Sequence, residues 1–197
     1  MRHLFLINPA AGKRDRTREY QARIAAACSN LEYEVLVSQK PGDLTAWSRR
    51  AAASGEELRP YACGGDGTLN EVVNGIAGFS NAAVSHFPGG SGNDFIKIFT
   101  DPALFSNLHA LLDPKETEFD LISCNADYAI NVCSLGLDAR IGTEIARYKR
   151  LPLVTGTGAY ALSALVNVVR GIHRPYRVTW DGDSLAGELT MIFAGNG

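Results

Sequence analysis

Apolar runs alternate with segments of helical period along the first 88 residues of the chain. Short apolar runs predict strands, and the periodic segments predict helices. The predicted strands span 3–8, 32–38, 59–64 and 82–88, and the predicted helices 16–30, 43–54 and 68–76. This β-α-β-α-β-α-β order predicts a doubly wound, mostly parallel α/β sheet whose ligands bind beyond the carboxyl ends of the strands.

The pattern changes in the second half of the chain. A helix over 103–112 and a half-buried strand over 116–123 are predicted first. Further strands at 128–134, 177–180 and 184–194, with Asp181-Gly182-Asp183 as a hairpin turn, predict an antiparallel region. The expected domains are therefore 1–123 and 124–197. The uncharged stretch 151–169 favours a buried helix over a membrane-spanning or membrane-facing one.

Composition places the chain among soluble globular proteins. It has 197 residues, of which 46% are hydrophobic and 20% charged, enough for one domain or for one domain and part of another. Nineteen basic and 21 acidic residues give a net charge of -2, so no nucleic-acid partner is expected. The four cysteines form no C-x-x-C pair, which favours a reducing cytoplasm and no structural zinc.

Three glycine-bearing turns follow the first, third and fourth predicted strands, at 8–13, 64–68 and 88–94. Glycines let the backbone approach a polyphosphate closely, and a helix that starts near Thr68 directs its N–H groups at the anion. Asp66 would repel phosphate by itself, so its place in Gly64-Gly65-Asp66-Gly67-Thr68 predicts a divalent cation. The plain alternatives are a tight structural turn here and a helix-starting role for Asp94.

With these motifs in order, the chain resembles the diacylglycerol kinase catalytic domain family, in particular the bacterial soluble diacylglycerol and YegS-type lipid kinases. Sphingosine kinases share much of the motif set, and NAD and phosphofructo kinases share mainly the GGDG core. The motifs that carry the resemblance are 8–12, 64–75, 88–95, 120–121, 131–139, 160–162 and 194–197.

The resemblance implies an NAD-kinase/phosphofructokinase-like α/β domain followed by part of an antiparallel β-sandwich. It also implies ATP and Mg2+ in a cleft, with a lipid hydroxyl as phosphoryl acceptor, and so a role in phospholipid metabolism. The implied catalytic residues are Asp66 and Asp94, and the implied metal residues are Asp66 and Asp120. The implied nucleotide-binding residues are Asn8, Pro9, Ala10, Ala11, Gly12, Ser38, Gly64, Gly65, Asp66, Gly67, Thr68, Leu69, Asn70 and Ser91.

Relatives continue past the pair matching Asn196-Gly197 into a glycine-rich turn, an acidic metal cluster and a proposed general base. The chain is therefore expected to be an incomplete form with weak or no activity. An NAD-kinase-like enzyme acting on a soluble acceptor, or an inactive nucleotide-binding regulatory fragment, is the alternative.

The expected partners are a lipid substrate and the surface of a membrane, with a homodimer as a candidate assembly. A cytoplasmic protein peripheral to the membrane would make this contact through basic side chains around the uncharged stretch, unless they form only a solvated helix face. These are Arg147, Lys149, Arg150, Arg170, Arg174 and Arg177.

Overall fold

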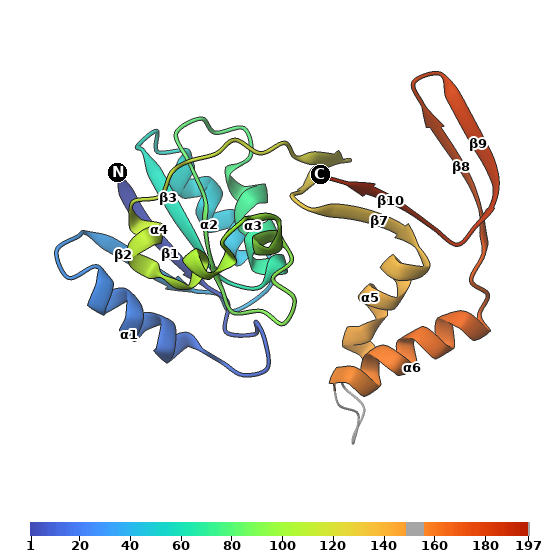
Figure 1. The fold of residues 1–197 in the computed structure, drawn as a ribbon, viewed down its shortest axis with the longest axis horizontal. Coiled ribbons are helices and arrows are strands. Elements are labelled where there is room, and N and C mark those ends of the chain that lie inside the picture. Colours follow the sequence, from blue (N-terminus) through green and yellow to red (C-terminus); the bar gives the residue numbers. More distant parts are fainter. Residues whose placement is uncertain (149–155, 197) are drawn as a thin grey trace. The chain divides into compact units, whose positions relative to one another are not determined.

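The computed structural model describes residues 1–148 and 156–196 of the chain. Its contacts divide it into two compact units, Met1–Asn131 and Val132–Gly197, which are described separately below (Figure 1). The domain boundary at 123/124 stays a prediction.

The N-terminal unit is built on a four-stranded parallel sheet, which confirms the predicted class. Its strand order is β2-β1-β3-β4, so the outer strands are β2 and β4, and each pairs with a strand that precedes it in the chain. β1 and β3 are apolar enough to be covered on both faces, and they are the central strands. The strands are β1 (Arg2–Ile7), β2 (Tyr33–Val37), β3 (Leu58–Gly64) and β4 (Ser85–Pro88).

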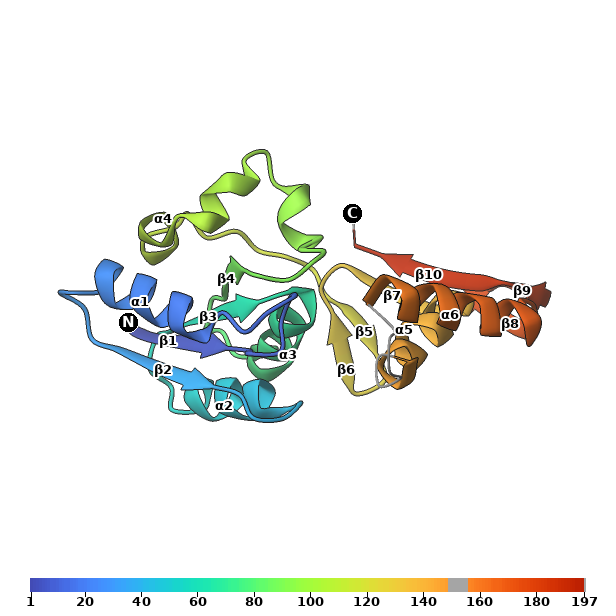
Figure 2. The ribbon, with the colours of Figure 1, turned by 90° about the horizontal axis from the view of Figure 1, so that it is seen from below.

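Helices cover both faces of this sheet (Figure 2). α1 (Thr17–Ala27) and α4 (Leu108–Leu112) pack on one face, around Phe5, Tyr61 and Phe87. α2 (Asp43–Ala52) and α3 (Asp66–Ile76) pack on the other face. The two helices on this second face meet closely because Gly75 has no side chain, and a Cβ added there would lie 2.5 Å from the Cβ of Ser48.

Several predicted elements differ from those observed. α3 begins at Asp66, two residues earlier than predicted, so the acid lies in its first turn. The strand predicted over 82–88 is shorter, because only Ser85–Pro88 forms β4. The strand predicted over 116–123 is wrong for 116–121, which is irregular, and only β5 (Ile122–Cys124) forms.

The predicted helix over 103–112 is broken in two. The 3-10 helix η2 (Pro102–Ser106) ends at Asn107, whose backbone is extended and whose side chain accepts a hydrogen bond from the N–H of His109 at the start of α4. A second 3-10 helix, η1 (Phe95–Ile98), follows the fourth-strand loop. Side-chain capping by asparagine thus overrides the apolar periodicity.

The strand predicted over 128–134 divides into two. β6 (Asp127–Ala129) forms a hairpin with β5, and Asn74 of α3 bonds both backbone groups of Tyr128, so this hairpin belongs with the N-terminal unit. β7 (Val132–Gly136) lies in the C-terminal unit.

The C-terminal unit contains antiparallel strands, as predicted, and a pair of helices. The first of these helices, over 137–148, was not predicted, and the strand predicted over 184–194 is interrupted at Thr190. β10 (Met191–Gly195) pairs with β7, and β8 (Arg174–Trp180) pairs with β9 (Asp183–Leu189). The turn between β8 and β9 has Asp181 at φ 45° and Gly182 at φ 92°, the two positive angles that a type I′ hairpin needs. α5 (Leu137–Tyr148) packs along α6 (Gly156–Val169).

α6 buries one face only, which differs from the fully buried helix expected. Ala159, Ser163 and Asn167 are buried, whereas Leu165 and Val169 are 61% and 79% exposed. Every helix among residues 1–148 and 156–196 is too short or too polar to cross a bilayer.

The predicted basic surface is described only in part. Lys149 and Arg150 lie outside the described residues, as does the side chain of Arg147. Arg170 pairs with Glu144 of α5, and Arg174 donates to the carbonyls of His173 and Arg170. Membrane contact through this surface stays a prediction.

Candidate active site

The loops that follow β1 and β3 meet at the carboxyl edge of the parallel sheet, because these two strands are neighbours. The N–H of Asn8 donates to the carbonyl of Cys63 at 3.1 Å, continuing the ladder past the strand end. The Asn8 amide then donates to the Thr68 hydroxyl at 3.1 Å and accepts from the N–H of Ala10 at 3.0 Å. Asn8 and Thr68 therefore fix the first loop to the first turn of α3.

Glycines of the three loops lie in direct backbone contact. A Cβ added to Gly90 would lie 2.4 Å from the Cα of Gly65, and one added to Gly12 would lie 2.5 Å from the carbonyl oxygen of Gly89. Gly12 also has φ 78°, a left-handed conformation that favours glycine. Gly64 is equally constrained, because a Cβ there would lie 2.2 Å from the hydroxyl of Thr68. The three loops thus present backbone rather than side chains at the sheet edge.

The fourth-strand loop is held by two residues that are not among the predicted site residues, Asn93 and Tyr20. Asn93 has φ 49°, and its side chain accepts from the N–H of Gly90 at 3.0 Å and donates to its carbonyl at 3.1 Å. Tyr20 of α1 lies under the loop, with its hydroxyl 1.8 Å from a Cβ added to Gly89. Burial raises the pKa of Tyr20 to about 12, so this hydroxyl keeps its proton. Asparagine tolerates a positive φ, so an asparagine directly after a glycine-rich run was the available signal for Asn93.

Two carboxylates face the same point of this loop cluster. Oδ2 of Asp66 and Oδ2 of Asp94 lie 3.0 and 3.3 Å from a Cβ added to Gly92. Asp66 is half-buried, and its other oxygen accepts from the N–H of Phe95 at 3.2 Å, which fixes its orientation. Asp94 is exposed and pairs with Lys97.

These two carboxylates suit Mg2+, although no group of three or more His, Cys, Asp or Glu that could hold a metal occurs among the described residues. Mg2+ usually binds through one or two carboxylates together with substrate phosphates and water. The glycine contacts leave backbone N–H groups, rather than side chains, to meet a polyphosphate. The residues present therefore fit ATP with Mg2+.

The other predicted site residues lie in several different surroundings. Ser38 is buried at the end of β2, and its N–H donates to the carbonyl of Ile7. The Leu69 side chain lies in the core, so it cannot face a nucleotide, whereas Ser91 is exposed in the fourth-strand loop. Asn70 lies in the second turn of α3, partly exposed. Asp120 lies in the irregular segment before β5 and lines a pocket with Leu69 and Phe95.

Comparison with known proteins identifies the family. The family model described as "Diacylglycerol kinase catalytic domain" matches residues 2–125. The chain is 30% identical over 193 residues to proteins named "Diacylglycerol kinase" from Staphylococcus aureus strains MRSA252 and Newman, covering 96% of this chain and 60% of those relatives. The chain thus spans 60% of the length of these curated relatives.

Solved structures show the same fold. A crystal structure titled as a diacylglycerol kinase from Bacillus anthracis str. Sterne matches with TM-score 0.66 and 23% identity, over 100% of this chain and 64% of that one. A second structure from the same organism gives TM-score 0.69, also at 23% identity, over 65% of its chain. These matches confirm a parallel α/β sheet followed by antiparallel strands. By the match of the family model to well over half of its length, this chain belongs to the diacylglycerol kinase catalytic domain family.

Proposed function

We propose that this chain carries the nucleotide-binding part of an ATP- and Mg2+-dependent kinase that transfers a phosphoryl group to the hydroxyl of diacylglycerol or a similar lipid. The observation that supports this most directly is the backbone contact between Gly65 and Gly90, with the Asp66 and Asp94 carboxylates flanking Gly92. Family membership and the names of the relatives supply the lipid acceptor.

The chain's own groups would act mainly by positioning. Phosphoryl transfer depends on holding the phosphates and the attacking hydroxyl in line and on neutralising charge. The loops at 8–12, 64–68 and 88–94 would hold the phosphates through backbone N–H groups. Asp66, fixed by the N–H of Phe95, and Asp94 would hold Mg2+, which supplies charge neutralisation on the phosphate oxygens when bound.

The exposure of Asp94 and of its partner Lys97 suits a second role for this acid at the acceptor end of the site. Its ion pair with Lys97 joins two exposed side chains, at 67% and 62%, so this contact is weak and can be exchanged for a ligand. Asp66 is the more rigid of the two acids. We therefore assign Asp66 to metal and nucleotide, and Asp94 to metal and the acceptor hydroxyl.

The substitution Asp66→Asn tests the nucleotide assignment. It keeps the size of the side chain and an oxygen for the N–H of Phe95, but removes the charge that a cation needs. We expect the affinity for Mg2+-ATP, measured by calorimetry, to fall by about tenfold or more, which is ~1.4 kcal/mol. The affinity for ATP in EDTA should change far less. Equal affinities for Mg2+-ATP in the two proteins would contradict the assignment.

The acceptor is tested separately on the intact gene product. Transfer of label from γ-labelled ATP to diacylglycerol in mixed micelles is expected. Transfer to NAD without lipid would establish a soluble acceptor instead. Nucleotide binding without any transfer would establish a regulatory protein.

A further inference from the structure

The three glycine loops carry few positive charges for a site that is proposed to hold a polyphosphate. None of the predicted nucleotide-binding residues is basic. Asp66 and Asp94 add negative charge at one end of the fourth-strand loop, beside Gly92. Mg2+ neutralises only part of the charge of a triphosphate, so a cation at the other end of this loop would stabilise the bound nucleotide.

Arg16 is the cation that lies at that other end. It immediately precedes α1, which starts at the carboxyl edge of the sheet because it follows the loop after β1. Its Nη1 lies 3.1 Å from a Cβ added to Gly89. The carbonyl oxygen of Gly89 in turn lies 2.5 Å from a Cβ added to Gly12. Nη1 therefore stands where the loops after β1 and β4 meet.

Two neighbours on α1 fix the guanidinium group of Arg16. Glu19 accepts hydrogen bonds from Nε, at 3.0 Å, and from Nη2. The guanidinium carbon lies over the ring of Tyr20, 5.2 Å from the ring centre, and Tyr20 is itself only 2% exposed. An arginine held in this way loses little conformational freedom when it binds an anion.

The third nitrogen of this guanidinium is left for a ligand. Nη1 has no hydrogen-bond partner among residues 1–148 and 156–196, and it is not one of their buried unpaired atoms, so a ligand can reach it. The Arg16 side chain as a whole is 27% exposed. Nη1 carries two N–H donors, and the bidentate pair with Glu19 uses the opposite edge of the group.

The other basic side chains next to the loops are less suited to this role. Lys97 is paired with Asp94, at the acidic end of the fourth-strand loop. Lys13 is exposed, without a hydrogen bond or ion pair in the described part of the chain, and Arg14 is 81% exposed. Neither of these two side chains is held in place before a ligand binds.

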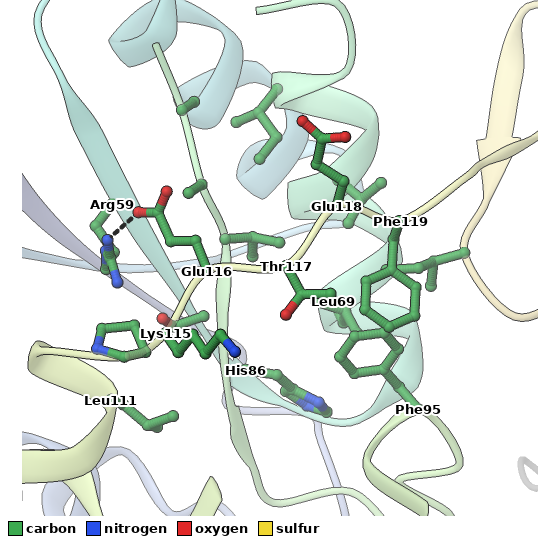
Figure 3. Close-up of a pocket in the computed structure, with 18 of the residues that line it drawn as sticks. Arg59, Leu69, His86, Phe95, Leu111, Lys115, Glu116, Thr117, Glu118 and Phe119 are labelled. Carbon is green, nitrogen blue, oxygen red and sulfur yellow. Dashed lines mark hydrogen bonds and ion pairs between the residues drawn. The ribbon is translucent and has the colours of Figure 1, made fainter. Parts of the chain in front are cut away.

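The largest pocket of the N-terminal unit is not an alternative site for a polyphosphate. It lies at the free edge of β4, with a volume of about 1580 Å³, and none of the three glycine loops lines it. Its buried arginine, Arg59, is paired with Glu116 (Figure 3). Acidic side chains outnumber basic ones around this pocket, so it would repel an anion.

We infer that Arg16 binds a phosphate oxygen of the nucleotide at the Gly89 end of the fourth-strand loop. The inference rests on the proposed function and goes further, because it divides the phosphates between two sets of groups. Asp66 and Asp94 act through the metal, whereas Arg16 binds the phosphate directly and needs no metal. The direction in which the polyphosphate lies along the loop is set by these opposite charges at its two ends.

Calorimetric titrations of the full 197-residue chain with ATP, in Mg2+ and in EDTA, separate the two contributions. Arg16→Gln should weaken ATP binding by about tenfold in both media, as expected for the loss of one charge-assisted hydrogen bond. Asp66→Asn should weaken it mainly in Mg2+. The loss in Arg16→Gln should shrink at high salt, because Nη1 is open to solvent and its charge is screened.

Two further variants make the test specific. Arg16→Lys keeps the positive charge but cannot form the bidentate pair with Glu19, and its affinity for ATP should stay within about threefold of wild type. Arg18→Gln removes the same charge from an exposed position on α1, and it should leave ATP affinity unchanged in both media.

Three results would overturn the inference. Wild-type affinity of Arg16→Gln in EDTA would show that Arg16 does not bind phosphate directly. An equal loss in Arg16→Lys would assign the effect to packing on Tyr20, and an equal loss in Arg18→Gln would assign it to the overall charge of α1. Failure of the wild-type chain to bind ATP in either medium is a different outcome, because it would remove the proposed function itself.

Discussion

The two units differ in how far the apolar side chains of their strands are buried. In the N-terminal unit, Leu4 to Ile7 of β1 are at most 1% exposed, because helices cover both faces of the sheet. In the C-terminal unit, Val132 and Leu135 of β7 are each 54% exposed, and Phe193 of β10 is 61% exposed. The covered sheet can hold loops in fixed contact, whereas the β7–β10 pair has apolar side chains that the described residues leave uncovered.

The largest expected difference between the units is in the free energy of unfolding that is lost when an aromatic ring is removed. Phe87 is 1% exposed and packs edge-on against Tyr20, so Phe87→Ala should lower the free energy of unfolding of the N-terminal unit by about 3–5 kcal/mol. Phe193→Ala removes a ring that is 61% exposed, and should cost only about 0.5 kcal/mol.

The two tryptophans allow each unit to be followed separately. Trp47 lies in α2 and Trp180 in β8, so a Trp180→Phe background reports on the N-terminal unit and a Trp47→Phe background on the other. Urea unfolding followed by fluorescence gives both free energies. A loss of several kcal/mol from Phe193→Ala would mean that the β7–β10 pair is covered in solution, and would remove the contrast.

The second expected difference between the units is in the effect of replacing a glycine by alanine on nucleotide affinity. Gly90→Ala would place a Cβ 2.4 Å from the Cα of Gly65, a backbone contact that cannot move aside, so the loops must separate. We expect the dissociation constant of Mg2+-ATP to rise by about tenfold or more, or ~1.4 kcal/mol. Gly142→Ala in α5 is the control, because a Cβ there meets nothing within 4 Å. Unchanged nucleotide affinity in the first variant would show that loop contact is not needed for binding.

The sequence predicted the N-terminal unit well because its signals are local. Each strand is a short apolar run, each loop carries glycines, and parallel pairing brings the loops to one edge. The sequence could not show that Asn93 and Tyr20 support the loop, because their roles depend on a positive φ and on packing between distant segments. It failed at 116–121, where alternation suggested a strand, but this segment is irregular and does not pair with β4, the outer strand of the sheet.

The last expected effect is a pH dependence of the stability of the N-terminal unit. Burial lowers the pKa values of His86 and His3 below the ordinary value of 6.5. The unfolded chain therefore binds more protons than the folded one as the pH falls through about 6.5, so stability present at pH 7.5 is lost toward pH 5.5. The slope is at most about 1.4 kcal/mol per pH unit for each histidine.

The urea experiment with Trp47 as reporter, repeated at pH 7.5, 6.5 and 5.5, measures this slope. His86→Phe should flatten it by removing one of the two histidines, and His86→Phe with His3→Phe should flatten it further, whatever the variants do to stability at pH 7.5. A wild-type slope that both variants leave intact would mean that neither ring is held neutral by burial.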